Sequence, residues 1–509
     1  MLINKLQLDY KPVQLILPVN YEHIIDDCDQ VISFKEVVGG LNLRKFIKTS
    51  LKGRHDYDPE VMLHLILFGF MENIRSLRKL EQACRNDIRF MYLGNSIKPS
   101  FMAFQRFIDD KLTESIDDIF YTINQFLIEK ENINTEVLHV DGTKIEANAN
   151  KFTFVWKKAV LNYQSKLFIK ITKAIKEIKR DLNYDYPISE AYLSEDLSKL
   201  CTLLDIEVDR QGIEFVYGKG KRKTPLQRYY ETFHGYRDKL KEYENHLEIC
   251  GLRNSYSKTD HDATFMHGKE DYYNKTGIFK PYYNIQIGVS DEYILHYGVY
   301  PNPTDTKTWI PFFDSFHYRY GFYPNKPVAD AGYGSYDNYM YNLKHNMKLS
   351  MKYHMFSKED EKKFKKQKYN IKNMTVEHDR IISEDGHVYV YSHDYENRKG
   401  VYTRIIQVYK HSDWKETYKE LKIPKTIGRD ISLLEMQSEA KAYLKSDEGI
   451  DLRVRRSIEV EGAFGDIKSN SEYTRIQRRG KLGVQTEIAL VLIGYNLRKY
   501  HAKKHRILH

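Results

Sequence analysis

The sequence predicts an α/β protein whose mixed sheet, flanked by helices, is joined by an all-helical N-terminal domain, a helical insertion and a mostly β insertion. Two apolar runs that end in an aspartate with glycine close behind, at Asp141 and Asp330, predict strands of the central sheet. Long stretches with apolar residues at helical spacing, before and after the first of these strands, predict the helical parts. Alternating apolar and polar residues late in the chain predict the β insertion.

The composition is that of a large folded protein with a basic surface. Hydrophobic residues make up 41% of the 509 residues, which is enough for several buried cores. The 80 Lys and Arg residues exceed the 70 Asp and Glu residues, so the formal net charge is +10. This charge fits a polyanionic partner, and it equally fits a basic protein without one.

Cysteine spacing and hydropathy exclude two classes of protein. The four cysteines are too far apart in the sequence for the ligand spacing of a zinc site. The longest apolar run, from Leu63 to Met71, is far shorter than the roughly 20 residues that a membrane span needs. No signal-peptide pattern opens the chain. We therefore expect a cytoplasmic protein with no structural zinc and no membrane partner.

Residues 1–130 are predicted to form a helical DNA-binding domain. Between residues 58 and 111 apolar residues recur at helical spacing in several short segments. Asp58 and Ser100, each next to a proline, are N-cap residues for two of these helices. Short helices in a compact basic unit are typical of a helix-turn-helix, and a plain helical scaffold is the alternative.

A strand that ends in a carboxylate follows this domain. The run Val137–Val140 stops at Asp141, with Gly142 behind it, and a glycine here would let a nucleic-acid strand come close. Residues 157–255 are then long, charged and helical, which predicts a helical insertion. A basic loop in it contains Lys221, Arg222 and Lys223, a pattern that fits a DNA-backbone contact, a dimerisation arm or a solvated charge run.

The second half of the chain repeats the theme of strands and carboxylates. The runs "YYNIQIGVS" and "YILHYGVYPNP", with "DE" between them, predict a hairpin, and "KPVADAGYGSYDNY" predicts a second strand that ends in Asp330. Residues 351–444 form the mostly β insertion, with a turn at "EDG". Aromatic residues there are candidates for stacking on bases, although sheet packing is the alternative for each of them: Trp414, Tyr389, Tyr391 and Tyr402.

Acidic residues at two strand ends and on a later helix could converge at one edge of a sheet. Three carboxylates bind two Mg²⁺ ions, and such a pair activates an attacking water or hydroxyl and stabilises the leaving oxygen in phosphodiester transfer. An Asp-Gly pair after a strand is also a common turn, so spacing alone leaves both interpretations open.

Several motifs together resemble those of bacterial insertion-sequence transposases of the DDE class. They are "VDGTKIEANANKFTFVW", "TDHDATF" ahead of "KPYYNIQIG", "NPTDTKT", "VADAGYGSYDNY" and "RRSIEVEGAFGDIKSN" with the later "RRGKLGVQTEIALVLIGYNLRK". Residues 58–111 look like the helical N-terminal domain of that family. The resemblance implies an RNase H-like catalytic core made of residues 131–156, 256–350 and 445–505.

The resemblance places the first two catalytic acids on Asp141 and Asp330, and the third on one of two glutamates. Glu459 and Glu461 point in nearly opposite directions because a helix turns about 100° per residue. Relatives carry a lysine seven residues after the glutamate, which Lys468 provides for Glu461, whereas Asp466 stands at that place for Glu459. Relatives also carry an arginine four residues before it, where Glu461 has Ser457, with Arg456 one residue away, and Glu459 has Arg455. Glu461 is therefore the predicted third acid.

The activity implied is that of a transposase that binds the terminal inverted repeats of its element, frees a 3′ hydroxyl and directs it onto target DNA. Asp141, Asp330 and Glu461 would hold two Mg²⁺ ions, for which Mn²⁺ substitutes, and a homodimer would act in the synaptic complex. The predicted location is the bacterial cytoplasm, on the nucleoid when the protein is bound to DNA. The predicted DNA contacts are Lys468, Arg456, Arg455, Lys221, Arg222, Lys223 and Trp414. The alternatives are a domesticated, catalytically inactive sequence-specific DNA-binding protein and, third, a stand-alone RNase H-like nuclease.

Overall fold

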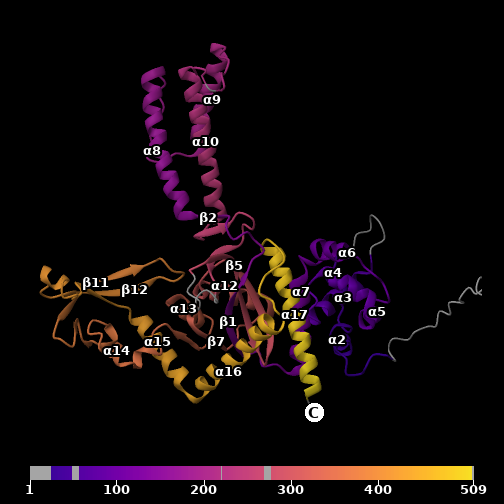
Figure 1. Ribbon diagram of the computed structural model, residues 1–509. Helices are drawn as coiled ribbons and strands as arrows, with labels where there is room; N and C mark the ends of the chain where they lie inside the picture. Colours follow the sequence, from indigo (N-terminus) through magenta and orange to yellow (C-terminus); the bar gives the residue numbers. More distant parts are fainter. Residues whose placement is uncertain (1–23, 49–56, 219, 269–276, 507–509) are drawn as a thin grey trace, which may run out of the picture. The chain divides into compact units, whose positions relative to one another are not determined.

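The computed structural model describes residues 24–48, 57–218, 220–268 and 277–506. The chain divides into two compact units, Met1–Ile133 with Ile488–His509, and Asn134–Glu487. Helices make up the N-terminal region, and a mixed sheet with helices on it forms the centre of the second unit (Figure 1). The predictions of a mixed α/β protein, of a mixed sheet flanked by helices and of a helical N-terminal region are thereby confirmed.

The first unit is built around one buried helix. In α3 (Pro59–Met71) the residues Leu63 to Phe68 are buried except for His64, so the helix is surrounded by others. Asp58 caps it by accepting the N–H groups of Glu60 and Val61, as predicted. Around it lie α2 (Gln30–Val38), η2 (Leu43–Phe46), α4 (Leu77–Asn86), α5 (Ile88–Leu93), α6 (Phe101–Phe107), the π-helical turn η3 (Ile108–Leu112) and α7 (Ile116–Glu131).

The last helix of the chain, α17 (Lys481–Arg506), packs backbone to backbone on the end of α3. A Cβ atom on Gly494 would lie 2.4 Å from the carbonyl oxygen of Phe70, so only glycine allows this approach. Arg498 Nη1 donates to the carbonyl oxygens of Phe70 and Met71, at 3.2 and 3.1 Å. These contacts add hydrogen bonds to the carbonyl groups at the C-terminal end of α3.

The central sheet of the second unit has the order β4-β5-β1-β7-β8, and β6 pairs with β5. Its strands are β1 (Val137–Glu146), β4 (Thr264–His267), β5 (Phe279–Ser290), β6 (Tyr293–Tyr300), β7 (Lys326–Gly334) and β8 (Met351–Tyr353). β1 pairs with β7, and β7 with β8, in parallel, while the other pairs are antiparallel. The predicted hairpin is β5–β6, and both residues of its turn, Asp291 and Glu292, have positive φ, as a type I′ hairpin turn requires.

Helices on this sheet come from the stretches between and after the strands. They are α12 (Trp309–Tyr320), α13 (Tyr336–Lys344), α15 (Ile431–Lys445) and α16 (Asp447–Gly465), which continues into the π-helical turn η8 (Asp466–Asn470). α16 packs against β1, β5 and β7. A short 3-10 turn, η4 (Asp305–Lys307), precedes α12 and contacts β7.

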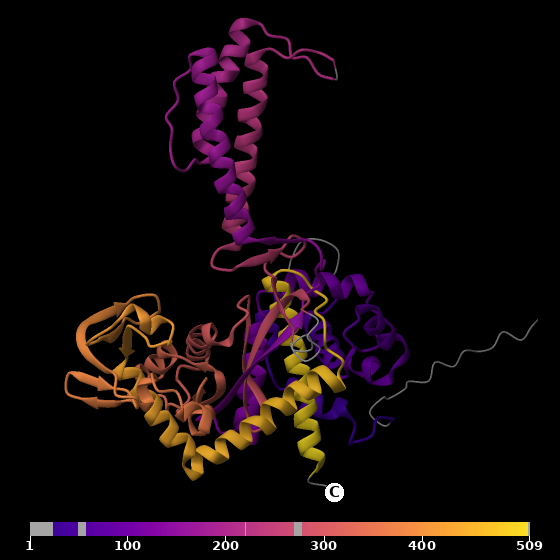
Figure 2. The same cartoon turned by 60° about the vertical axis from the view of Figure 1, so that its left-hand side comes forward.

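The helical insertion has a core of its own. In α8 (Lys157–Leu182), α9 (Ser194–Gln211) and α10 (Pro225–Cys250), α10 packs against both other helices, and the three lie side by side in Figures 1 and 2 (Figure 2). Buried Leu and Ile residues of all three helices form this core. A two-stranded sheet, β2 (Phe154–Trp156) with β3 (Ser255–Ser257), joins the ends of the insertion.

The β insertion is an antiparallel sheet of order β13-β12-β11-β10-β9. The strands are β9 (Thr375–Glu377), β10 (Arg380–Ile382), β11 (Val388–Asn397), β12 (Arg404–His411) and β13 (Thr426–Arg429), and the short turns η5 (Lys358–Asp360), α14 (Lys362–Lys365), η6 (Ile371–Asn373) and η7 (Glu416–Lys419) accompany them. The "EDG" turn joins β10 to β11, while residues 398–403 join β11 to β12 in a second hairpin.

Tyr389 does not have the exposure that base stacking needs. Its side chain is fully buried among Met374, Ile381 and Tyr409, and its hydroxyl donates to the carbonyl oxygen of Pro424 at 3.0 Å. The stacking hypothesis for this residue was wrong because β11 alternates, and Tyr389 falls on its inner face. Tyr391, two residues on and beside the bulge in the β11–β12 pairing, is 39% exposed.

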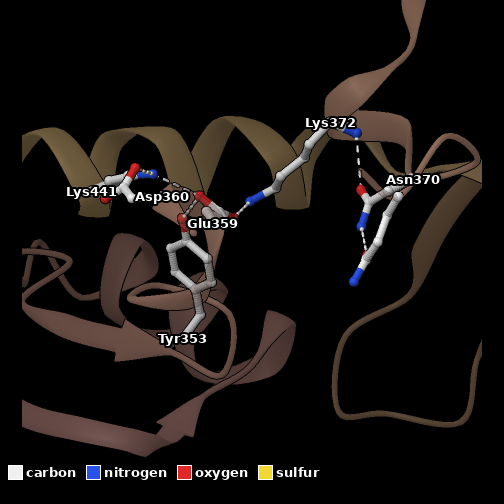
Figure 3. Close-up of polar contacts among 7 residues, drawn as sticks. Tyr353, Glu359, Asp360, Asn370, Lys372 and Lys441 are labelled. Atoms are coloured by element: carbon white, nitrogen blue, oxygen red, sulfur yellow. Dashed lines mark hydrogen bonds and ion pairs between the residues drawn. The ribbon is translucent and has the colours of Figure 1, made fainter. Parts of the chain in front are cut away.

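A buried carboxylate ties the β insertion to α15 (Figure 3). Glu359 accepts hydrogen bonds from Tyr353 Oη at 2.6 Å, from Lys441 Nζ at 2.9 Å and from Lys372 Nζ. Burial acts to raise the pKa of Glu359, but these three donors outweigh it and hold the pKa below its ordinary value.

We expect Glu359→Gln to lower the free energy of unfolding by about 3 kcal/mol, because it leaves two lysines at a buried site without their carboxylate. Asp360→Asn is the matched control. The Asp360 carboxylate, next to Glu359 in the sequence, is 58% exposed and pairs with Lys441 and Lys445, so the loss of stability should be small. The contribution of Glu359 should be present above its unfolded pKa of about 4.3 and be lost as the pH falls through the lower folded pKa. Urea unfolding at pH 7 and pH 3 measures both effects, and equal losses in the two variants would contradict them.

Candidate active site

Asp141 and Asp330 lie on the same face of neighbouring parallel strands. The ladder between β1 and β7 pairs His139 with Val328, and each aspartate is two residues further along its strand. Because side chains alternate between faces, both carboxylates lie on the face of His139. The predicted strand ends are not observed, since β1 continues past Asp141 to Glu146 and β7 past Asp330 to Gly334. The ladder ends at this pair, so the aspartates stand where the strands separate.

Backbone N–H groups fix the two carboxylates. Asp141 Oδ1 accepts the N–H of Gly142 at 2.7 Å, and Asp330 Oδ1 accepts the N–H of Gly332 at 2.8 Å. Asp141 Oδ2 also lies 3.4 Å from Nη1 of Arg456, an α16 residue that is only 14% exposed. This nitrogen is buried and makes no hydrogen bond in the described structure, so its interaction with Asp141 is one of charge.

Gly142 is required by the protein itself. A Cβ atom there would lie 2.0 Å from Gln286 Nε2 and 2.8 Å from Asp305 Oδ1, because the antiparallel register sets Gly142 opposite Gln286 on β5. The space we expected to admit DNA is therefore filled by a side chain. Gly332, in contrast, is exposed.

We expect Gly142→Ala to lower the free energy of unfolding by about 1–3 kcal/mol, because the fully buried Gln286 must move to admit the methyl group. Gly462→Ala in α16 has nothing within 4 Å of its new Cβ and should instead raise stability by up to about 1 kcal/mol, as alanine favours helix. Chemical unfolding of both variants measures the two signs. Wild-type stability in Gly142→Ala would show that the pocket around Gln286 yields.

A third aspartate, Asp305 in η4, lies beside this edge of the sheet. Its Oδ1 accepts hydrogen bonds from Asn284 Nδ2 and Gln286 Nε2, each at 2.8 Å, and the Gln286 carbonyl oxygen accepts from the hydroxyl of Tyr333. Burial, and then the charges of Asp305, Asp141 and Asp330, raise the pKa of Tyr333 far above its ordinary value. The charges of three carboxylates thus act on one buried tyrosine.

Asp305 is the aspartate of the motif "NPTDTKT", and the sequence predictions gave it no role. The signal that would have found it is the alternation of β5, in which Asn284 and Gln286 are polar residues at positions that face the sheet's buried side. Buried amides require partners, and a carboxylate in the next turn can supply them.

The three acids predicted from sequence are not assembled into a ligand set. Among the described residues, no group of three or more His, Cys, Asp and Glu side chains lies close enough together to hold a metal ion. Asp141 and Asp330 are brought together by the sheet, while Arg456 approaches Asp141 from α16.

Glu459 lies on the buried side of α16 and is partnered there. Its Oε2 accepts the N–H of Glu292 at 3.3 Å, and its Oε1 lies 3.7 Å from Nε2 of His139. Burial lowers the pKa of His139 to about 4, with Arg456 and Arg455 acting in the same direction, and burial raises the pKa of Glu459. His139 is therefore neutral at pH 7, and the contact is not an ion pair.

Glu461 is exposed, and within the described ranges it makes no hydrogen bond or ion pair. Glu459 reaches toward the β5–β6 turn and the first half of β1, so Glu461, about 200° further around α16, lies away from that end. Lys468 in η8 donates to the carbonyl oxygen of Lys144 at 3.2 Å, three residues beyond Asp141 on β1. Lys468 thus contacts the part of β1 that follows Asp141.

The other predicted DNA contacts differ in their availability. Arg455 pairs with Asp451 at 2.9 Å and is 60% exposed, whereas Arg456 lies in the site beside Asp141. Lys221 and Arg222 are exposed, and Lys223 pairs with Glu231; Lys219 of the same loop lies outside the described residues. Trp414 is half-buried, with Lys425 Nζ 4.9 Å and Lys419 Nζ 5.9 Å from its ring centre.

Two family models match the chain. A transposase DDE domain matches residues 387–501, and a transposase domain (DUF772) matches residues 17–110. These matches support an insertion-sequence transposase of the DDE class. The DDE match includes Glu461. It covers neither of the strands that carry the aspartates, because both lie upstream of residue 387. A search of curated proteins and a search of solved structures each found no match.

The transposase domains imply DNA as the partner of this chain, and DDE transposases generally use divalent metal ions. In the part of the chain that the structure describes, no helix combines the length and apolar character needed to cross a membrane.

Proposed function

We propose that this transposase binds the terminal inverted repeats of its insertion sequence and catalyses metal-dependent strand cleavage and strand transfer on an RNase H-like core. The observation that carries the proposal is the pair Asp141 and Asp330, on one face of neighbouring parallel strands in a chain of the DDE class. Neighbouring strands of a sheet fix two carboxylates more rigidly than loops would, which suits them to hold ions for phosphodiester chemistry.

The donor chemistry of the two aspartates fits Mg²⁺, because carboxylate oxygens are its preferred protein ligands. One oxygen of each carboxylate accepts a backbone N–H, which leaves the other for an ion: Asp141 Oδ2, now beside Arg456, and Asp330 Oδ2. We propose Glu461 as the third ligand and two ions in all, with Mn²⁺ as a substitute. Bound ions would supply a nucleophile at neutral pH and stabilise the leaving oxygen.

In this proposal the chain's own residues orient and neutralise. Gly142 N–H and Gly332 N–H hold the aspartates, and Gln286 and Tyr333 support the wall behind them. Arg456 balances the charge of Asp141 and is a proposed contact of a DNA phosphate. Lys468, held at the carbonyl of Lys144, is the proposed phosphate contact on the Glu461 edge.

Two further features belong to the proposal. A homodimer would hold both element ends in one complex, with the DUF772 region and the insertions contributing to end recognition. The test is cleavage of a labelled duplex that contains the element's terminal repeat. We expect a nick with a free 3′ hydroxyl in Mg²⁺ and none in EDTA. End binding without cleavage in any divalent ion would favour the alternative, a catalytically inactive sequence-specific DNA-binding protein.

A further inference from the structure

A basic loop follows η8 beside the end of β1. The basic loop, Thr474–Lys481, reads "TRIQRRGK" and contains four cationic residues and no acidic one: Arg475, Arg478, Arg479 and Lys481. Its start pairs with β1 in parallel, because Glu146 N–H donates to the Thr474 carbonyl oxygen at 3.3 Å and Ile476 N–H donates to the Glu146 carbonyl oxygen at 2.9 Å. The loop is therefore anchored to the same strand that carries Asp141.

The backbone of the basic loop is held from inside by Glu487, a residue of α17 that is 4% exposed. One or both Glu487 oxygens accept the N–H of Gln477 at 3.0 Å, the N–H of Arg478 at 2.8 Å and the hydroxyl of Tyr473 at 2.9 Å. Burial raises the pKa of Glu487, against these hydrogen bonds. A buried carboxylate used in this way fixes a loop's shape, because removing it leaves several donors without partners.

Two aspartates of the "TDHDATF" motif hold the far end of the loop. Asp262 Oδ2 accepts the N–H of Lys481 at 2.7 Å. Asp260, which is 4% exposed, accepts the N–H of Gly480 at 3.3 Å and the hydroxyl of Tyr283 at 2.9 Å. With its N–H groups turned inward, the loop presents cationic side chains to the solvent: Arg475, Arg479 and Lys481 are exposed.

The surface around the loop is strongly positive. Arg479 Nε donates to the carbonyl oxygen of Asn148 at 2.8 Å, which orients its guanidinium. Glu146 lies within 3.8 Å of Arg475, 3.7 Å of Lys151 and 3.2 Å of Lys280, so three cations share one carboxylate. Five residues of strand separate Asp141 from Glu146, roughly 17 Å at 3.3 Å per residue. A nucleic-acid strand that lies along the loop can thus reach the aspartates.

We infer that the basic loop binds the phosphodiester backbone of DNA next to the aspartate site, and that Glu487 is the positioning residue that holds the loop in its binding shape. The inference rests on the proposed function. Fixed guanidinium groups suit phosphate oxygens, and the position of the loop on the strand of Asp141 favours a nucleic acid over an acidic protein.

The surface variant Arg475→Ala/Arg479→Ala/Lys481→Ala tests the surface itself. Binding of a duplex of unrelated sequence is measured by fluorescence anisotropy in Ca²⁺ over a series of salt concentrations. We expect weaker binding to every duplex, and a slope of log K against log salt that is smaller by about 2 to 3, since each lost phosphate contact accounts for roughly 0.9. The control Lys362→Ala/Lys363→Ala/Lys365→Ala removes the same charge from exposed lysines of α14. Equal effects of the two triple variants, or none from the first, would overturn the inference.

Glu487→Gln tests the positioning role. Its amide offers one acceptor oxygen and sets an NH₂ group against backbone N–H donors, so we expect DNA affinity to fall at least about fivefold and the salt slope to fall with it. Asp262→Ala, which releases the N–H of Lys481, should act in the same direction and keeps the test decisive if Glu487→Gln folds poorly. A lower melting temperature with unchanged affinity in both variants would assign Glu487 and Asp262 a merely structural role.

These measurements separate the inference from the proposed function. If the loop variant loses DNA binding and the wild-type protein does not cleave, the inference that the loop binds DNA is supported and the proposed cleavage activity is contradicted. Unchanged binding beside a cleavage activity that depends on Asp141 would do the reverse. Binding of polyglutamate to the wild-type protein is also compared with binding of DNA, by competition between the two. If polyglutamate binds the wild-type protein as tightly as DNA does, an acidic protein becomes the partner.

Discussion

Asp141→Asn and Asp330→Asn are each expected to reduce cleavage of a terminal-repeat duplex in Mg²⁺ by about a thousandfold or more. Each change keeps the shape of the side chain and removes the charge that would hold an ion. The double variant should be no worse than either single variant, because groups that act as one unit do not contribute additively. DNA binding in Ca²⁺ should be nearly unchanged, since binding rests on phosphate contacts elsewhere.

The two variants are not equivalent structurally, and this sharpens the test. Asp141→Asn leaves the mostly buried Arg456 without its counter-charge, so some loss of stability is expected along with the loss of cleavage. Asp330 makes no ion pair within the described residues, so Asp330→Asn should lose cleavage at wild-type stability. Asp451→Asn, on the exposed side of α16, is the control and should cleave normally. Normal cleavage by Asp330→Asn would show that the aspartates on β1 and β7 do not together form the active site.

Local signals predicted much of what the structure shows. The strands that carry Asp141 and Asp330, the Asp291–Glu292 hairpin turn and the Asp58 cap depend on a few neighbouring residues, and each is observed. The predicted strand ends were wrong, because β1 continues to Glu146 and β7 to Gly334. Patterns of alternation and capping determine such features without reference to the rest of the chain.

Features that depend on register or on long-range packing did not follow from the sequence. The contact of Gln286 and Asp305 with Gly142 depends on how β5 is aligned with β1, and a shift of one residue would turn Gln286 to the other face. Arg456 was predicted as a DNA contact because its charge was visible, while its approach to Asp141 depends on how α16 crosses the sheet. Tyr389 was misjudged for the same reason, since its face of β11 was unknown.

The second large effect concerns the two glutamates of α16. We expect Glu461→Gln to match the aspartate variants, with cleavage reduced by about a thousandfold or more and end binding retained. Glu459→Gln should keep most of the cleavage activity, because Glu459 is already partnered by the N–H of Glu292 and lies beside a neutral His139. The effect of Glu459→Gln should instead be a modest fall in the free energy of unfolding, since the variant alters a mostly buried contact.

The reasoning for Glu461 rests on direction and on freedom to move. Glu459 reaches toward the β5–β6 turn, whereas Lys468 contacts Lys144 in the second half of β1, so the edge of α16 opposite Glu459 is the one directed toward the part of β1 that begins at Asp141. An exposed side chain without hydrogen bonds in the described structure can turn toward an ion at little cost, whereas Glu459 would first have to leave its partners. Nicking of the labelled duplex in Mg²⁺, with binding and melting temperature measured in parallel, compares the two variants. A cleavage-dead Glu459→Gln beside an active Glu461→Gln would reverse the assignment. Full activity in both would place the third ligand elsewhere, and Asp305, whose carboxylate lies beside both Gly142 and Gly332, would be the next candidate.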